Sequence, residues 1–321
     1  MKKNKFLYIF GIIAFLGVIV VIIILNLKNF TNSNSENSIA ISNNLEKYSY
    51  NNPIVPEGFK KVETSIASWN LENDIPVGWN NGLVIEDEIG NQFVWVPVNL
   101  NGLPYPEHRI GWEGSYFYNN NNLDDTIKKY GGFYIGRYEA GVPESIQSIN
   151  TNISEETNNI EGIPVSKKRV RVWNFISYDN AEKNAKKMYS NEQIQSELIS
   201  MEQAVWVFKW LNESGYDVYS DSTSWGNYSN NIFTFTGEYS GDYGKNYQYG
   251  ENMSKTYRNI ITSTGICETN MVNNIYDLAG NVWDATRTPM KSNNSFHYCF
   301  GGHYDTTRIP SSRFRSICLL F

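Results

Sequence analysis

The sequence predicts an α+β fold for most of the chain, residues 53–321. Two segments carry apolar residues at helical spacing behind a capping serine, and two others alternate apolar and polar residues as strands do. The remainder is rich in Tyr, Asn and Gly and lacks the regular alternation of strands and helices that a parallel sheet requires. We therefore expect one loop-rich domain with two helices and short strands.

A hydrophobic segment precedes this domain. Residues 6–25 contain no charged side chain, and this length of helix is about enough to cross a bilayer core of roughly 30 Å. Three lysines lie before it, so the positive-inside rule predicts a cytoplasmic tail at residues 1–5, a single transmembrane anchor at 6–27 and an extracytoplasmic remainder. The alternatives are a buried core helix and a cleaved signal peptide, but no small-x-small cleavage site follows Leu25.

The segment after the anchor, residues 28–52, is dominated by Asn and Ser and is interpreted as a stalk, because such a composition buries too little apolar surface to fold. The formal net charge is −6, and the first thirty residues hold four lysines and no acid, so the rest of the chain is distinctly acidic. Proteins that bind nucleic acid gain most of their affinity from basic contacts to phosphate. Nucleic acid is therefore excluded as a partner.

The first elements of the domain are extended. Residues 82–98, GLVIEDEIGNQFVWVPV, contain two apolar runs joined by a Gly-Asn turn, which predicts a β-hairpin. Residues 131–141, GGFYIGRYEAG, alternate apolar with small or polar side chains and predict a further short strand. The polar stretch between them, residues 118–125, is interpreted as a loop.

Two helices are expected next. In SYDNAEKNAKKMYS, residues 177–190, Ser177 is suited to cap the helix, and apolar residues recur along one face. In SMEQAVWVFKWLNESG, residues 200–215, Ser200 and Gln203 have the spacing of a capping box, and the final glycine suits the helix end.

A stretch near the C-terminus, NNIYDLAGNVWDATRT (residues 273–288), places two carboxylates around a Gly-Asn pair. Asp277 and Asp284 meet only if the chain between them folds back as a turn, which Gly-Asn favours. Two carboxylates and turn carbonyls together form the hard oxygen ligand set that Ca²⁺ prefers. The alternative is that Asp277 caps the turn, Asp284 is solvated and Trp283 belongs to the core.

Residues 274–286, NIYDLAGNVWDAT, also carry a resemblance, since they are similar to the signature N-x-x-G-L-x-D-M-x-G-N-V-W-E-W of formylglycine-generating enzymes. The predicted helices stand where this family, also called sulfatase-modifying factors, has its two helices. Phe-Gly-Gly-His-Tyr at 300–304 stands where R-G-G-S-W is usual, and Arg-Phe-Arg at 313–315 where G-F-R is usual. The resemblance covers residues 53–321 in order and implies a C-type-lectin-like fold.

The resemblance also implies a calcium site. In this family an acid or amide before the turn and an acid after the tryptophan supply side chains, and backbone carbonyls complete the coordination. By position, this implicates the carboxylates of Asp277 and Asp284 and the carbonyls of Gly280 and Val282. The family's glutamate is replaced here by Asp284, one methylene shorter, so either reach is lost or a water molecule fills the gap. We expect structural Ca²⁺ at these four residues.

Catalytic members of the family bind copper through two cysteines that follow the G-G-S motif. Counted along that motif, the two positions fall on Thr306 and Ser311, and a hydroxyl does not replace a thiolate as a Cu(I) ligand. We therefore expect no copper and a non-catalytic domain; the alternative is a formylglycine-generating oxidase with an atypical site. The chain's own cysteines lie elsewhere and allow one disulfide without fixing the pair: Cys267, Cys299 and Cys318.

Binding is the function that remains. Three loops, residues 223–231, 237–252 and 297–308, mix Tyr, Trp, Asn, Gly and Ser, which combines rigid aromatic contact with adaptable hydrogen bonding. Such loops either contact a ligand or pack on their own core. We expect a cell-surface protein or glycan as the partner, contacted by aromatic, His and Arg side chains of these loops: Trp225, Tyr228, Tyr239, Tyr243, His303, Tyr304 and Arg308.

Overall fold

The computed structural model describes most of the domain in these ranges: 48–100, 125–146, 160–174, 176–191, 193–231, 233–235, 255–257, 261–290, 295–306 and 311. The proposed anchor lies outside them, and no helix within them has both the length and the apolar character needed to cross a bilayer. One compact unit spans Ser49–Phe321. It therefore includes the last residues of the segment interpreted as a stalk, where Ser49 and Asn52 form a β-bridge.

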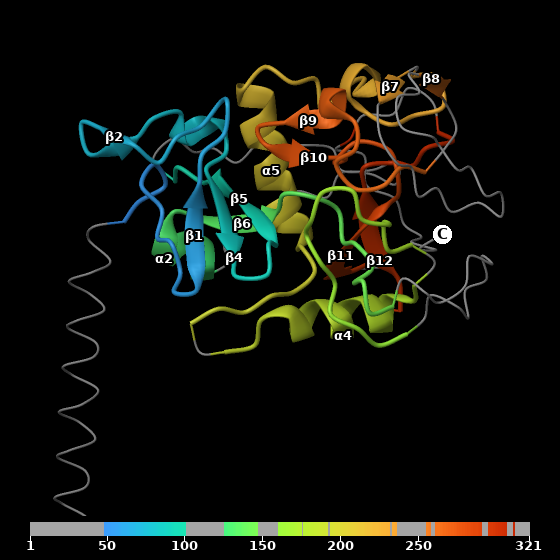
Figure 1. The fold of residues 1–321 in the computed structure, drawn as a ribbon, viewed down its shortest axis with the longest axis horizontal. Helices are drawn as coiled ribbons and strands as arrows, with labels where there is room; N and C mark the ends of the chain where they lie inside the picture. The colour runs from blue at the N-terminus through green and yellow to red at the C-terminus, as the bar shows by residue number, and fades with distance from the viewer. Residues whose placement is uncertain are drawn as a thin grey trace, which may run out of the picture. The chain divides into compact units, whose positions relative to one another are not determined.

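The fold is α+β, with few helices among the described residues and several small antiparallel sheets. The largest sheet has four strands in the order β1-β4-β5-β6 (Figure 1). The predicted hairpin is present, since β4 and β5 pair with Val84 opposite Val94. The predicted strand at 131–141 is also present but shorter. In chain order the four strands are β1 (Phe59–Val62), β4 (Val84–Asp87), β5 (Gln92–Pro97) and β6 (Gly132–Gly136).

Side chains of this sheet alternate between two hydrophobic cores, as strand geometry requires. Val84, Val94 and Val96 belong to the larger core, which extends into the C-terminal half of the domain. Ile85 and Trp95 point the other way, into a smaller core covered by the segment that includes β1. The sheet is thus buried on both faces, and its apolar residues leave little surface for function.

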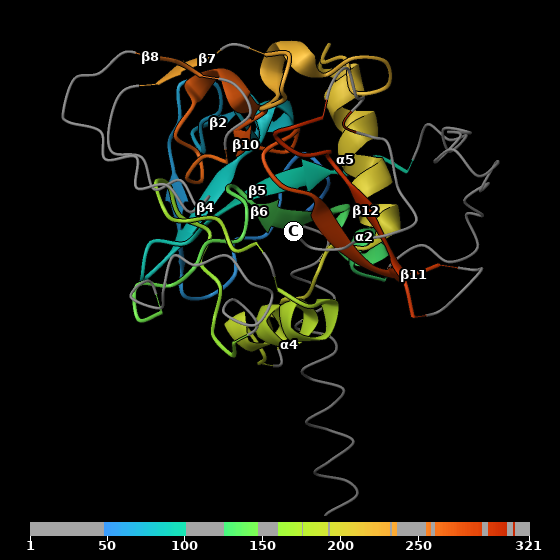
Figure 2. The same ribbon diagram turned by 90° about the vertical axis from the view of Figure 1, so that its right-hand side faces the viewer.

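Helix α5 (Met201–Glu213) contacts strands from both the N-terminal and the C-terminal part of the domain. It begins with the predicted capping box, in which the Ser200 hydroxyl and the Gln203 side chain each bond the other residue's backbone. The helix packs against β5 and against β11 (Asp284–Pro289) (Figure 2). Leu211 on this helix is completely buried, as its position on the predicted apolar stripe requires.

Two further helices lie outside this contact. The predicted α4 (Tyr178–Met188) is capped by Ser177 and lies along the lower edge of the coloured domain in both views (Figures 1 and 2). Helix α2 (Asp125–Tyr130) was not predicted, because six residues are too few to show helical periodicity. It starts at the last residue of the stretch interpreted as a loop.

The remaining elements are short, and four two-stranded antiparallel sheets account for the remaining strands among the described residues. Strand β12 brings Phe300 against Phe208 of α5, with ring centroids 5.3 Å apart. These paired strands, besides β11, are β2 (Leu71–Glu72), β3 (Ile75–Pro76), β7 (Phe233–Phe235), β8 (Lys255–Tyr257), β9 (Met271–Val272), β10 (Ile275–Tyr276) and β12 (His297–Phe300). Single 3₁₀ turns occur at Trp79–Asn81, Thr223–Trp225 and Glu268–Asn270.

Candidate functional site

The stretch between β10 and β11 is a buried bend, as the Gly-Asn pair predicted. Asp277, Gly280 and Asn281 all have positive φ, at 59°, 80° and 55°. Backbone hydrogen bonds fasten the bend to two distant segments, because Gly280 N–H donates to Gly301 O (2.9 Å) and Asn281 N–H donates to Asn227 O (3.0 Å). The bend is therefore held by contacts from outside its own sequence.

Gly280 is required at the centre of this bend. A Cβ atom there would lie 2.1 Å from the carbonyl oxygen of Asn227, far inside van der Waals contact, and φ is in the left-handed region. The approach of these two backbones is what lets the bend dock onto residue 227.

Asn281 is the hub of the buried polar interior beneath the bend. Its Oδ1 accepts from Thr262 N–H (2.8 Å) and from Asn227 Nδ2 (3.0 Å). Its Nδ2 donates to Glu139 Oε2 at 2.5 Å and to the Thr262 carbonyl at 3.2 Å. A buried amide pays a large desolvation cost unless it is paired, and here both ends are satisfied. One side chain thus joins the chain after β6 to two C-terminal loops.

The predicted site residue Asp277 is fully buried at the start of the bend. Its Oδ2 accepts a hydrogen bond from Gly265 N–H at 2.6 Å. Its Oδ1 is buried and has no hydrogen-bond partner among the described residues. The second predicted carboxylate, that of Asp284, likewise has a buried Oδ2 with no partner in the described part of the chain. Unpaired buried oxygens are rare in folded proteins and call for an explanation.

A glycine borders the Asp284 carboxylate. A Cβ at Gly301 would lie 3.0 Å from Asp284 Oδ2 and 3.1 Å from the carbonyl oxygen of Leu278. The absence of a side chain at Gly301 therefore leaves a small space lined by a carboxylate oxygen and a backbone oxygen. Oxygen atoms of this kind are ligands for Ca²⁺.

A third buried carboxylate, that of Glu139, lies beside this pair and was not predicted. It is 8% exposed, and besides Asn281 it accepts a long hydrogen bond from Val282 N–H at 3.4 Å. The sequence alone did not indicate it, because an acid near the end of a predicted strand usually faces solvent. The sequence feature that could have indicated its burial is its place in RYEAG, between apolar residues and small residues.

The three carboxyl groups resist ionisation in this interior. Burial raises the pKa of Asp277 to about 7, although Gly265 N–H and the nearby Asn270 amide lower it in part. Burial, and then the charge of Asp277, raise the pKa of Asp284 well above its usual range. Burial raises the pKa of Glu139 in the same way, and both aspartates add to the rise. A nearby cation would remove this conflict, because it favours the charged forms.

The donor set fits a calcium ion in kind. Two carboxylates with unpaired oxygens flank the bend whose carbonyls were predicted as ligands, and Gly301 leaves room beside one of them. However, no three His, Cys, Asp or Glu side chains in the described ranges converge closely enough to hold a metal by themselves. Coordination here would thus depend on Gly280 and Val282 carbonyls and on water, in addition to Asp277 and Asp284.

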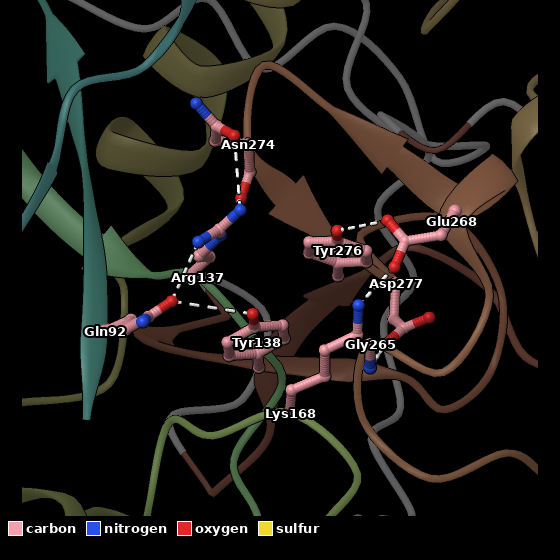
Figure 3. A network of polar contacts seen from close by, with 9 residues as sticks. All are labelled: Gln92, Arg137, Tyr138, Lys168, Gly265, Glu268, Asn274, Tyr276 and Asp277. Atoms are coloured by element: carbon pink, nitrogen blue, oxygen red, sulfur yellow. Dashed lines mark hydrogen bonds and ion pairs between the residues drawn. The ribbon is translucent and has the colours of Figure 1, made fainter. Parts of the chain in front are cut away.

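A second polar cluster ties the bend to the large sheet (Figure 3). Arg137, just after β6, donates from Nη1 to Gln92 Oε1 (2.8 Å) and from Nε to Asn274 O (3.2 Å). Its guanidinium carbon lies 5.6 Å from the ring centroids of both Tyr138 and Tyr276, which stack on each other. Arginine thus combines hydrogen bonding with cation–π contact, which lysine does less well.

Tyr276 continues this cluster to the surface (Figure 3). Its hydroxyl donates to Glu268 Oε2 at 2.6 Å, and the other oxygen of Glu268 pairs with Lys168. Lys168 Nζ also lies over the Tyr276 ring, 5.4 Å from its centroid. These contacts fix the residue that immediately precedes Asp277, so they position the first carboxylate of the bend.

The residues predicted to contact a ligand divide into three groups. Trp225 and Tyr228 are both buried, and the Tyr228 hydroxyl donates to Gly301 O at 2.5 Å, so these two residues support the bend from the core. Of the two roles expected for these loops, packing on the core is the one that Trp225 and Tyr228 have, because their rings pack in the same core as α5. Tyr239, Tyr243 and Arg308 lie outside the described residues.

His303 and Tyr304 are half-buried and lie on the surface of the bend. His303 forms an ion pair with Asp305 (3.1 Å), and its ring lies 5.7 Å from Trp283 and 5.6 Å from Tyr304. Trp283 lies between the proposed ligands Val282 and Asp284. The alternative interpretation placed it in the core, but it is only half-buried. These three rings, with Asp305, form what we call the aromatic patch.

The two positions that correspond to copper-binding cysteines have structural hydrogen bonds. Thr306 Oγ1 donates to His303 O at 2.7 Å. Ser311 is fully buried, and its hydroxyl accepts from Ser222 Oγ at 3.1 Å. Both hydroxyls thus stabilise the loops after β12.

Of the cysteines, Cys299 on β12 is disulfide-bonded and Cys267 is a buried free thiol, in line with the expectation of one pair. Cys318 lies outside the described residues.

Comparisons of the chain with models of known protein families, with curated proteins and with solved structures find no match. The resemblance to formylglycine-generating enzymes therefore stays a prediction.

The first prediction concerns Gly280. Replacing it with alanine should destabilise the protein by roughly 3 kcal/mol or more, because left-handed strain of about 1–2 kcal/mol is added to a backbone clash. Gly215→Ala is the matched control, since φ is 93° there but no atom lies within 4 Å of the added Cβ. Urea denaturation should show a much smaller loss for Gly215→Ala; equal losses would contradict the docking of the bend.

The second prediction concerns pH. In cation-free protein, folded Asp277 keeps its proton up to about pH 7, whereas an unfolded aspartate releases it near 3.9. The folded state therefore binds more protons between these values, and the free energy of unfolding should fall as pH rises from about 5 to 7.5. Acids with lowered pKa values, such as Asp87, have completed their opposite contribution below this window.

Asp277→Asn is the control for this measurement. His297, whose burial lowers its pKa, contributes the opposite slope in both proteins and cancels in their difference. Thermal unfolding in chelator should show stability falling more steeply with pH in the unsubstituted protein. Identical slopes would show that Asp277 titrates normally.

Proposed function

We propose that this chain is a membrane-anchored, extracytoplasmic domain similar to sulfatase-modifying factors, with a C-type-lectin-like fold and no catalytic role. A calcium ion stabilises its C-terminal bend, and surface loops on that bend bind a protein or glycan at the cell surface. The observation that carries the proposal is the pair of buried, unpartnered carboxylate oxygens of Asp277 and Asp284 on either side of the bend.

The calcium ion would be held by Asp277, Asp284 and the carbonyls of Gly280 and Val282. Ionised carboxylates in a protein interior are unfavourable without a partner, and a divalent cation supplies one. When bound, it would link the end of β10 to the start of β11 and thereby order the loop between them. The ion has a structural role here, since no substrate atom is required at the bend.

The aromatic patch supports the binding role. Trp283 is attached directly to the proposed ligand Asp284, so ordering of the bend also orders the patch. Rigid aromatic rings beside a His–Asp pair offer flat apolar faces together with hydrogen-bonding groups. Such surfaces suit sugar rings and protein side chains alike.

An oxidase is less well supported. The reaction of the resembled enzymes depends on thiolate ligands for copper, and the corresponding Thr306 and Ser311 are hydroxyls that serve the local hydrogen bonding. The disulfide at Cys299 removes that sulphur from the thiolate form as well.

The third prediction tests the calcium site. Full-length protein in detergent, stripped with chelator, should melt roughly 5–10 °C higher when Ca²⁺ is about a hundredfold above its dissociation constant. Asp284→Asn should abolish this increase, because it removes a ligand charge without changing shape. Asp305→Asn, an exposed carboxylate nearby, should keep it. Equal melting of the unsubstituted protein with and without Ca²⁺ would reject the site.

The fourth prediction tests the binding role. Screened against an array of cell-surface glycans and against solubilised surface proteins, the protein should retain a ligand in Ca²⁺ and lose it in chelator. His303→Ala should reduce that binding at least about tenfold, as loss of a central contact does, with an unchanged melting temperature. Phe296→Ala is the control, because this aromatic residue is 43% exposed but precedes β12 at the end away from His303. Binding unaffected by His303→Ala would exclude the patch.

A further inference from the structure

Glu139 is a buried acidic side chain that the proposed calcium site does not use as a ligand. It reaches the bend from the N-terminal half of the domain, 143 positions before Val282 in the sequence. Its Oε2 accepts from the Asn281 side chain at 2.5 Å, and its Oε1 faces Val282 N–H at 3.4 Å. Each oxygen of Glu139 thus faces a hydrogen-bond donor in the turn, one on Asn281 and the other on Val282.

These contacts give Glu139 control over the turn geometry. The Asn281 side chain is already bound by Thr262 and Asn227, so the amide is held from three directions. Val282 N–H belongs to the same peptide unit as the Asn281 carbonyl, and the Val282 carbonyl is a proposed ligand. Glu139 therefore helps to orient a ligand without touching the ion, as groups around metal ligands commonly do.

The charge of Glu139 acts over a longer distance than its hydrogen bonds. It interacts electrostatically with both Asp277 and Asp284. An ionised carboxylate in an interior of low effective dielectric constant attracts a cation bound nearby, and the Coulomb energy of this attraction grows in proportion to the charge of the ion.

We propose that Glu139 is a positioning residue and the third negative charge of the cation site, so that it raises affinity and makes the site prefer ions of higher charge. This inference rests on the proposed calcium site and identifies the class of cation that the site selects. The inference follows from the placement of three carboxyl groups around one bend. Two of these groups, those of Asp277 and Asp284, each have a buried oxygen without a hydrogen-bond partner among the described residues.

The fifth prediction uses terbium as the probe, because Tb³⁺ takes the oxygen ligands of Ca²⁺ and Trp283 lies next to a ligand and can sensitise its luminescence. Full-length, chelator-stripped protein is titrated with Tb³⁺ and then with competing Ca²⁺. Glu139→Gln should weaken Ca²⁺ binding about tenfold and Tb³⁺ binding about thirtyfold, since the lost Coulomb energy scales with ion charge. The preference for terbium should therefore fall about threefold.

Two further variants separate charge from shape. Asp87→Asn is the matched control: Asp87 is also 8% exposed and also accepts backbone and side-chain hydrogen bonds at a turn, but in the β4–β5 hairpin. It should leave both affinities unchanged. Glu139→Asp keeps the charge and shortens the reach, so it should retain the preference for terbium even though hydrogen bonds to the turn are weakened.

The outcomes are distinguishable. If Glu139→Gln leaves both affinities unchanged, or lowers both by the same factor, the charge role is overturned. A loss of the terbium preference in Glu139→Asp would overturn it as well, and this variant decides the matter if Glu139→Gln does not fold. If the unsubstituted protein binds neither ion, the calcium site of the proposed function fails, and the role of Glu139 fails with it.

Discussion

The hydrogen bonding of Asn281 is the interaction on which the C-terminal half depends. Its side chain is buried and bonds to Thr262, Asn227 and Glu139, which come from three separate parts of the chain. A buried amide with every bond made specifies one arrangement, because any shift leaves polar atoms without partners. The segments that carry these residues are therefore fixed relative to one another.

The same arrangement brings several buried acidic side chains together. Asp87 shows the usual solution to a buried carboxylate, since its oxygens accept from Asn91 and Tyr189 and its pKa stays low. Asp277 and Asp284 each have an oxygen that accepts no hydrogen bond from the described residues, and their pKa values are raised instead. The cation that we propose at the bend would resolve the difference between these two environments. This difference is why we propose a structural ion at the bend and not merely a capped turn.

The binding surface that we propose depends on this support. Function in loop-rich domains lies on exposed segments carried by a rigid base. Here Tyr228 and Trp225 form part of the base, whereas Trp283, His303 and Tyr304 remain accessible beside the bend. The Arg137 cluster supports the other end of the same segment through Tyr276. An ion that orders the bend would thereby also order the surface that contacts a ligand.

The sequence by itself determined the features that depend on local interactions. The capping box of α5, the N-cap of α4, the β4–β5 hairpin and the bend at Gly280 were all predicted, because caps and turns are encoded within a few residues. Only the tertiary structure decided which polar residues meet. Glu139 and Asn281 lie 142 positions apart, and nothing local in either segment indicates the contact. Burial of Tyr228 likewise results from packing against Gly301 and α5, so its aromatic loop looked equally suited to a surface or to a core until the chain was folded.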